Sequence, residues 1–202
     1  MVLKRHNKST SQFASLILFL MLLSCTACQK SSSESPVTTI YLVRHAEKIK
    51  GVKDPDLSPS GFQRAKKLAD TLRSLPIEQT YATQYKRTQQ TVAEVAKSIE
   101  KKTIIYKAHA IKKLGQTLTQ TYPGKHVLVA GHSNTIPKII KELGVKEEIT
   151  IDYKTGYDDL YVVFWRKGKP AKWMHLHYGK RLYKKGKQAK TPKGSSTQPV
   201  NR

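Results

Sequence analysis

The sequence predicts an α/β domain, built as a three-layer α/β/α sandwich around a mainly parallel sheet. Short runs of β-branched and aliphatic residues alternate with segments whose apolar residues recur at helical spacing. This alternation is typical of βαβ units, whose helices cover both faces of the sheet. A length of 202 residues and a hydrophobic fraction of 38% indicate one domain with unfolded extensions. They exclude a multidomain machine and a polytopic membrane protein.

Each expected element follows from its own local pattern. Residues 37–43 are β-branched or aliphatic almost without interruption, which predicts a buried strand. Residues 60–75 carry apolar side chains three and four positions apart, which predicts a helix, and Ser58 or Ser60 can cap it. The other expected elements, in order, are a strand at 80–83, a helix at 88–99, a strand at 103–106, a weak helix at 111–122, a strand at 126–130, a helix at 136–143, and strands at 160–165 and 173–177.

Two of the expected strands end in motifs that contain histidine. The first strand runs into Arg44-His45, and the strand at 126–130 runs into Gly131-His132. Ligands of open α/β sheets bind beyond the carboxyl ends of the parallel strands, so we expect both histidines at the ligand-binding edge. Arg87 opens an expected helix and supplies a second arginine.

These residue types together predict a phosphate site. Guanidinium groups offer forked donors that match phosphate oxygens, and helix starts add backbone N–H groups. Ser133 and Asn134 follow the second histidine and supply further donors. An imidazole has an ordinary pKa of about 6.5, so one histidine can serve as a neutral nucleophile and the other as a proton carrier or donor.

Four motifs in this order resemble the histidine phosphatase superfamily, also called phosphoglycerate-mutase-like. They cover residues 42–47, 56–65, 87–91 and 131–133. The resemblance implies a phosphoglycerate-mutase-like fold and catalysis without a metal or other cofactor. It also implies that His45 is the nucleophile that becomes phosphohistidine, and that Arg44, Arg87 and His132 bind the phosphoryl group.

The chain departs from the family pattern in two places. Thr83 stands where the second-arginine motif usually begins with serine. Between residues 98 and 145 the acids are Glu100 and Glu142, so no carboxylate stands where the mutases have their general acid, which argues against a mutase. Glu47 is our first candidate for a substitute acid. Further candidates are Asp54, Asp56, Asp158, Asp159 and His109.

The start of the chain predicts export and lipid anchoring. A basic segment at 1–8 precedes an apolar run at 13–23, which is too short to span a membrane comfortably. The stretch resembles a bacterial lipoprotein signal at residues 1–24, with Cys25 as the lipidated residue in preference to Cys28; an ordinary signal peptide or an uncleaved anchor is the alternative. Both cysteines lie in this leader, so the folded domain has no thiolate ligand, disulfide or cysteine nucleophile.

The charge is distributed unevenly. The formal net charge is +23, and residues 166–202 hold twelve Lys and Arg with no acid after Asp159. We expect a Ser-rich tether at 25–36, the folded domain at 37–178 and a basic disordered tail at 179–202. The tail is a solvated segment or an arm for an anionic surface polymer; nucleic acid is a weaker expectation for an exported chain.

The sequence therefore predicts a metal-free phosphatase of the cell envelope, anchored to a membrane by lipid and facing the periplasm or exterior. Its partner is a phosphorylated small molecule. The alternatives are a phosphohistidine-type protein phosphatase and a non-catalytic lipoprotein that binds phosphate or polyanions. Lys48, Lys50 and Lys53 either contact a second anionic group or form a solvated loop.

Overall fold

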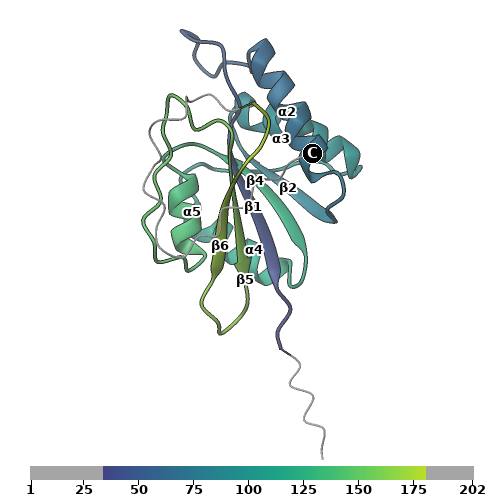
Figure 1. Cartoon of the computed structure of the whole chain (residues 1–202), viewed down its shortest axis with the longest axis vertical. Coiled ribbons are helices and arrows are strands. Elements are labelled where there is room, and N and C mark those ends of the chain that lie inside the picture. The colour runs from purple at the N-terminus through teal and green to yellow at the C-terminus, as the bar shows by residue number, and fades with distance from the viewer. Residues whose placement is uncertain (1–33, 181–202) are drawn as a thin grey trace, which may run out of the picture. The chain divides into compact units, whose positions relative to one another are not determined.

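A computed structural model describes residues 34–180 and shows one six-stranded sheet with helices on both of its faces (Figure 1). The strand order is β3-β2-β4-β1-β5-β6. The elements, in chain order, are β1 (Thr38–Arg44), α2 (Pro59–Leu72), β2 (Ile77–Thr83), α3 (Lys86–Ser98), β3 (Ile104–Tyr106), α4 (Ile111–Thr121), β4 (His126–Gly131), α5 (Ile136–Glu142), β5 (Asp159–Trp165) and β6 (Lys172–His177).

The sheet is mainly parallel, as the alternation of strands and helices predicts. Strands β1, β2, β3 and β4 pair in parallel, whereas β5 lies antiparallel to β1 and β6 lies antiparallel to β5. Strand β1 occupies a central position, and all seven of its residues are buried. The α/β class and the sandwich architecture are therefore confirmed, and element ends differ from expectation by three residues or fewer.

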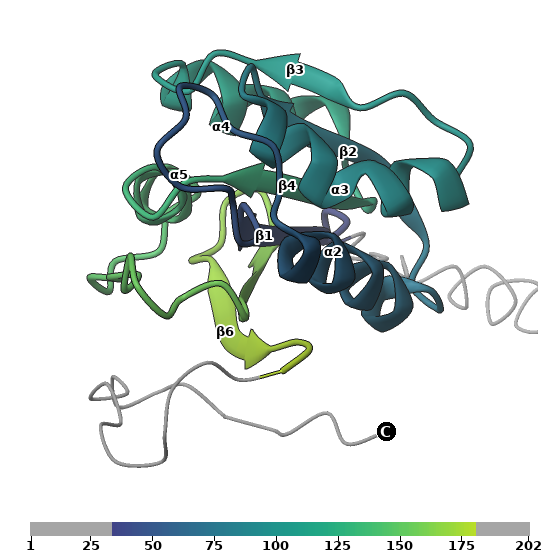
Figure 2. The same cartoon turned by 90° about the horizontal axis from the view of Figure 1, so that it is seen from above.

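Two apolar cores flank the sheet, one beneath each helix pair. Viewed from above, α2 and α3 cover one face and α4 and α5 cover the other (Figure 2). The first core packs Leu68 and Val92 against Tyr41 of the sheet. The second packs Leu118 and Ile139 against the opposite face. Period-two alternation along each strand supplies both cores with side chains, as expected for a sheet covered on both sides.

Several expectations concern residues outside the described range. The signal segment at 1–24, Cys25, most of the tether at 25–36 and nearly all of the tail at 179–202 fall there. Among residues 34–180, no helix is both long enough and apolar enough to cross a membrane.

Candidate active site

The two histidines meet where β1 and β4 end. These strands are parallel neighbours, with Arg44 in register with Gly131. The His45 backbone N–H donates to the Gly131 carbonyl at 2.9 Å, which continues the ladder one residue beyond the strand. The rings of His45 and His132 face each other edge to face, with centroids 5.5 Å apart. Adjacent parallel strands thus bring together two motifs separated by 87 positions in the chain.

His45 is held as a neutral imidazole with one free nitrogen. Its Nδ1 lies 2.8 Å from the Ala46 carbonyl oxygen, which only accepts, so Nδ1 carries the proton and Nε2 keeps its lone pair. Burial, opposed by this hydrogen bond and reinforced by the charges of Arg44 and Arg87, lowers the pKa of His45 to about 3. The imidazole is therefore unprotonated across the whole neutral range.

His132 is neutral for the same reasons and is fixed by a chain of hydroxyl groups. Burial, with added repulsion from Arg87 and Arg44, lowers its pKa to about 4. Its Nδ1 accepts from Arg87 at 3.4 Å, so its Nε2 donates to the Thr83 hydroxyl at 3.0 Å. Thr83 in turn contacts the Thr88 hydroxyl at 2.7 Å. The threonine that replaces the family's usual serine thus keeps the hydroxyl contact with the ring.

Both arginines present donors that lack a partner among residues 34–180. The Nε atoms of Arg44 and Arg87 are buried, and neither donates a hydrogen bond within the described residues. Arg44 lies 4.0 Å from the ring centroid of Tyr157, and Arg87 lies 4.5 Å from that of Tyr85. Buried donors without an acceptor are costly unless a ligand satisfies them, so the pair fits an oxyanion.

The loop that follows His45 is hydrogen-bonded to the start of α3. Thr91 accepts from the Ala46 N–H at 2.9 Å and donates to the Arg87 carbonyl at 2.7 Å. Gln90 accepts from the Leu57 N–H at 2.8 Å, so α3 also contacts the far end of this loop. These contacts set the position of His45 relative to the second arginine.

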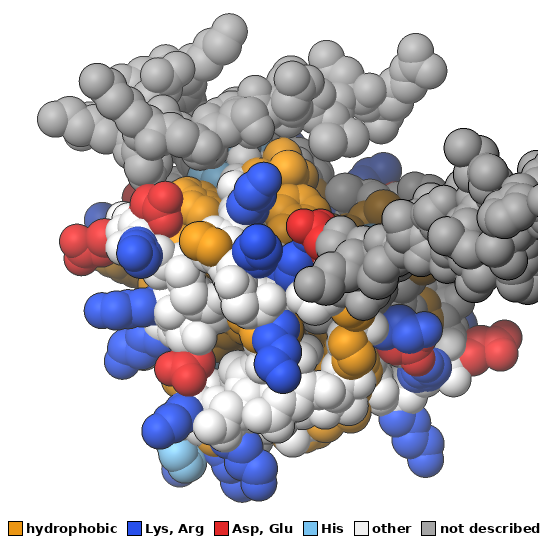
Figure 3. All heavy atoms as spheres, turned by 90° about the horizontal axis from the view of Figure 1, so that it is seen from below, with side chains coloured by type: hydrophobic (Ala, Val, Ile, Leu, Met, Phe, Trp, Pro, Cys, Tyr) orange, Lys and Arg blue, Asp and Glu red, His pale blue; other side chains and the backbone are white. Residues whose placement is uncertain are grey.

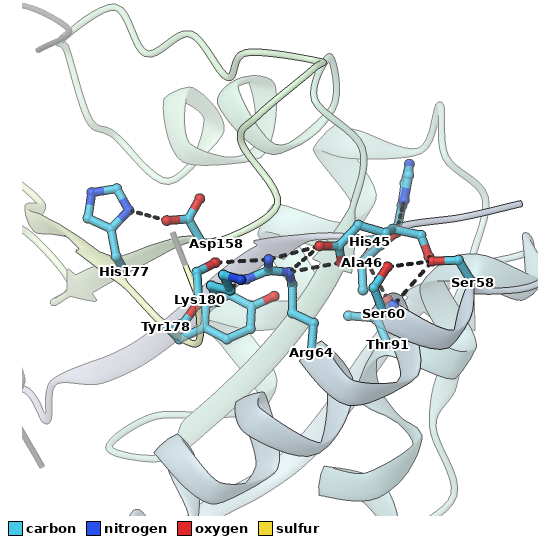
Figure 4. A network of polar contacts seen from close by, with 12 residues as sticks. His45, Ala46, Ser58, Ser60, Arg64, Thr91, Asp158, His177, Tyr178 and Lys180 are labelled. Carbon is cyan, nitrogen blue, oxygen red and sulfur yellow. Dashed lines mark hydrogen bonds and ion pairs between the residues drawn. The ribbon is translucent and has the colours of Figure 1, made fainter. Parts of the chain in front are cut away.

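The carboxylate of Glu47 is occupied by an ion pair. Both of its oxygens accept from Arg64 Nε, at 3.0 and 2.9 Å, and Oε1 also accepts from Nη2 at 2.8 Å. Arg64 comes from α2 and also donates to the carbonyls of Tyr178 and Lys180 (Figure 4). The ion pair joins the loop after β1 to α2 and to the segment after β6, which favours a positioning role for Glu47.

The remaining candidates are spread around the site. Asp54 lies 3.7 Å from Arg87 and caps the start of α3, and Asp56 accepts from Gln90. Asp158 and Asp159 face histidines of β6. His109 is exposed in the loop before α4, and Ser133 and Asn134 lie in the turn between β4 and α5. No hydrogen bond or ion pair within residues 34–180 joins a carboxylate to His45 or His132.

Two tyrosines that flank the site are not predicted by any sequence pattern. Tyr157 lies in the loop before β5, with its ring centroid 6.0 Å from that of His45, and Tyr85 lies 5.4 Å from His132. Neither belongs to a periodic segment, so no pattern marks them. The one indication is local: Tyr85 directly precedes the helix that begins at Lys86 and carries Arg87.

The structure is thus an α/β fold in which two histidines and two arginines meet at the carboxyl ends of the parallel strands. Such a group of side chains suits the binding of an oxyanion. The family model "Histidine phosphatase superfamily (branch 1)" matches residues 40–109. A curated Schizosaccharomyces pombe protein named as a probable phosphatase is 36% identical over 75 residues. That match covers 33% of this chain, and this chain spans only about a quarter (27%) of that relative's length.

Solved structures agree on the fold. The protein histidine phosphatase SixA, in complex with tungstate, superposes with a TM-score of 0.55 at 17% identity, covering 67% of this chain and 93% of that one. Phosphoserine phosphatase from Entamoeba histolytica, in complex with 3-phosphoglyceric acid, gives 0.50 at 16% identity, covering 72% and 98%. Residues 40–109 are therefore similar to the histidine phosphatase superfamily in sequence, and the fold of the described residues is that of these solved phosphatase structures.

Proposed function

We propose that this protein is a phosphatase that hydrolyses phosphomonoesters through a phosphohistidine on His45, without a metal. The observation that carries the proposal is the free Nε2 of a neutral His45 in a site with two buried arginine Nε donors, neither of which has an acceptor in the part of the chain that the structure describes. A phosphoryl group placed there satisfies the donors and meets the nucleophile. The family match and the curated relative support the same activity.

The chemistry runs in two steps. The Nε2 lone pair of His45 attacks phosphorus, an N–P bond forms, and the bond to the ester oxygen breaks as that oxygen leaves. Arg44 and Arg87 neutralise the charge on the non-bridging oxygens during the transfer. Water then attacks the phosphohistidine, the N–P bond breaks, inorganic phosphate is released and His45 returns to its neutral form.

The class of substrate depends on whether the site can protonate the leaving group. Neither histidine bears a carboxylate partner among the described residues, and Glu47 is engaged by Arg64. A good leaving group needs little protonation, so aryl esters, acyl phosphates and phosphoramidates fit this site better than alkyl esters. Phosphohistidine is itself a phosphoramidate, so a phosphohistidine-type protein phosphatase is the second candidate function.

The test is hydrolysis of p-nitrophenyl phosphate by the purified full-length protein from pH 4 to 8. We expect activity that survives a chelator, is inhibited by tungstate, and falls about 1,000-fold or more in His45→Ala. Quenching of the wild type with labelled substrate in alkaline detergent, where the N–P bond survives, is expected to trap a phosphoenzyme that His45→Ala lacks. A folded wild type that binds phosphate but forms no phosphoenzyme would instead support the non-catalytic phosphate-binding lipoprotein.

We also propose that the enzyme acts in the cell envelope, anchored through lipid on Cys25. Support comes from the basic, apolar and small-residue order of the first 25 residues. Fractionation of Cys25→Ser beside Cys28→Ser tests this. Only the first is expected to leave the membrane fraction, and retention of both would overturn the anchor.

A further inference from the structure

We propose a second site, distinct from the phosphate site, in which Asp159, His175 and His177 bind one zinc-like divalent cation that clamps the edge strand β6 to β5, with Asp158 beside His177. The cluster lies at the start of β5 and the end of β6, and Figure 4 shows His177 and Asp158 directed toward each other. The proposed phosphatase chemistry does not use these four side chains.

The strand register places the ligands together. In the antiparallel β5–β6 pair, Asp159 is opposite His177, and Tyr161 is opposite His175. Side chains two residues apart on a strand point to the same face, so both imidazoles lie beside Asp159. Asp158, the residue before the strand, reaches His177 from the adjoining turn.

The distances suit a small tetrahedral ion. His175 Nε2 lies 2.8 Å from Asp159 Oδ1, while His177 Nδ1 lies 3.5 Å from the same oxygen and 3.2 Å from Asp158 Oδ2. One donor atom each from Asp159, His175 and His177 lies within 4.8 Å of the other two. Zinc bonds of about 2.0–2.1 Å in a tetrahedron set neighbouring ligand atoms about 3.3 Å apart, so small side-chain movements complete the site.

The carboxylates of this cluster are buried, unlike those of an ordinary acidic cluster on a protein surface. The side chain of Asp158 is fully buried and that of Asp159 is 8% exposed. Neither Asp158 oxygen accepts a conventional hydrogen bond among the described residues. Buried carboxylates need a partner of opposite charge, and the ion partners that the structure gives this pair are His177 and His175.

The two nearby arginines, Arg44 and Arg64, do not form ion pairs with the aspartates of this cluster, all four residues being among those described. Arg44 faces Asp159 electrostatically but presents its Nε to the phosphate site, and Arg64 faces Asp158 but is committed to Glu47. A divalent cation would balance the two carboxylates where these guanidinium groups do not bind them. Two imidazoles with carboxylates favour zinc, cobalt or nickel over calcium or magnesium, which prefer oxygen ligands throughout.

Neighbouring groups hold the ligands in place. The ring of Tyr161 stacks on His175 with centroids 4.5 Å apart and planes 8° apart. The Asp158 carbonyl accepts from the Tyr178 N–H at 3.0 Å, which ties the turn before β5 to the residue after β6. Such support lowers the cost of ordering the ligands when the ion binds.

Isothermal titration with zinc alone, and with cobalt alone, tests the site in the full-length protein. All samples carry Cys25→Ser and Cys28→Ser, so that leader thiolates bind no metal. We expect one equivalent bound, a tetrahedral cobalt absorption spectrum, and a rise in unfolding temperature with zinc. In His175→Ala/His177→Ala we expect affinity to fall about 100-fold or more and the temperature rise to disappear. His109→Ala, an exposed histidine elsewhere, is the matched control.

The outcomes separate this site from the catalytic one. Binding that persists in His175→Ala/His177→Ala, or that is lost in His45→Ala, would overturn the proposal. Circular dichroism checks that the double variant folds; if it does not, Asp159→Asn replaces it, with the same expected loss of affinity. Phosphatase activity tests the proposed catalytic site, and zinc binding tests the proposed metal site. Loss of activity in His45→Ala with unchanged zinc binding therefore supports both proposals independently.

Discussion

A single backbone carbonyl sets the tautomer of His45, the nucleophile that we propose. The Ala46 oxygen holds the Nδ1 proton, so the reactive lone pair sits on Nε2, and burial keeps the ring uncharged. A reversed tautomer would place the N–H where the phosphoryl group must arrive. The orientation of this one ring therefore supports the proposed chemistry more than the mere presence of a histidine.

Glu47→Gln tests whether this carboxylate positions the loop or donates a proton. The change leaves the guanidinium of Arg64 without its counter-charge, so we expect the free energy of unfolding to fall by about 3 kcal/mol. Because the carboxylate is bound to Arg64, we expect kcat for aryl and alkyl phosphates to change by the same factor. Steady-state kinetics with both esters, and denaturant unfolding, measure the two effects.

The relative loss of kcat for the two esters distinguishes a proton donor from a positioning residue. A general acid contributes about 10²–10⁴-fold, and chiefly to poor leaving groups. A loss of alkyl-ester activity far greater than the loss for the aryl ester would therefore make Glu47 the proton donor. Glu94→Gln, an exposed change on α3, is the control and is expected to alter neither measurement.

Motif residues could be predicted from the sequence, whereas their partners could not. Arg44 and His45 follow an apolar strand directly, so their edge position is a local deduction. Arg64, in contrast, looks like one more cation on an amphipathic helix, yet it is 5% exposed and binds Glu47. Tyr157 depends on the path of an irregular loop. Such contacts arise from tertiary packing, which local periodicity does not encode.

At the scale of elements, the start of α2 is fixed against the loop after β1. Ser58 caps the helix by accepting from the Gly61 N–H at 3.2 Å, and its own N–H donates to the Glu47 carbonyl at 2.9 Å. Pro59 stands at the first helical position, where no N–H is needed. The sequence predicts this helix and its cap correctly, but not the closeness of its approach to the loop.

Gly61→Ala measures that close approach. In an exposed helix this change is stabilising, by roughly 1 kcal/mol. Here a Cβ would collide with the backbone carbonyl of Glu47, which cannot rotate away as a flexible side chain would. We expect the sign to reverse, with a loss of about 1–3 kcal/mol and lower kcat, because the loop carries His45 at its start.

Denaturant unfolding and phosphatase kinetics provide the readouts for Gly61→Ala. Lys66→Ala, at an exposed position of the same helix, is the control and is expected to stay within about 0.5 kcal/mol of the wild type. Stability equal to or above that of the wild type would show that α2 can move away from the loop, and would remove this explanation for the glycine.

At the scale of the whole molecule, excess positive charge surrounds a site that must keep two histidines neutral. Residues 34–180 hold 26 Lys and Arg against 14 Asp and Glu. The end of the domain remote from the site shows Lys and Arg side chains dispersed among uncharged ones (Figure 3). Burial lowers the pKa of His45 and His132 most, and the two buried arginines lower it further, so the immediate surroundings rather than the total charge keep both rings neutral.

The same arrangement makes stability depend on pH. In the unfolded chain both imidazoles have a pKa of about 6.5, whereas folding lowers that of His45 to about 3 and that of His132 to about 4. Between pH 6.5 and 4 the unfolded state therefore binds more protons than the folded state. The free energy of unfolding must rise with pH in this window, by up to about 1.4 kcal/mol per pH unit for each histidine, and must fall as the solution is acidified.

We expect urea unfolding from pH 7 to pH 4 to show this decline in the wild type. His45→Gln removes one titrating group, so its slope over that window should be shallower, while the exposed control His109→Gln should keep the wild-type slope. All three proteins have the same carboxylates, so the difference between the slopes reports the histidine that is replaced. Equal slopes for His45→Gln and the wild type would mean that the folded protein protonates His45 as readily as the unfolded chain does. That result would contradict the neutral nucleophile on which the proposed phosphatase chemistry depends.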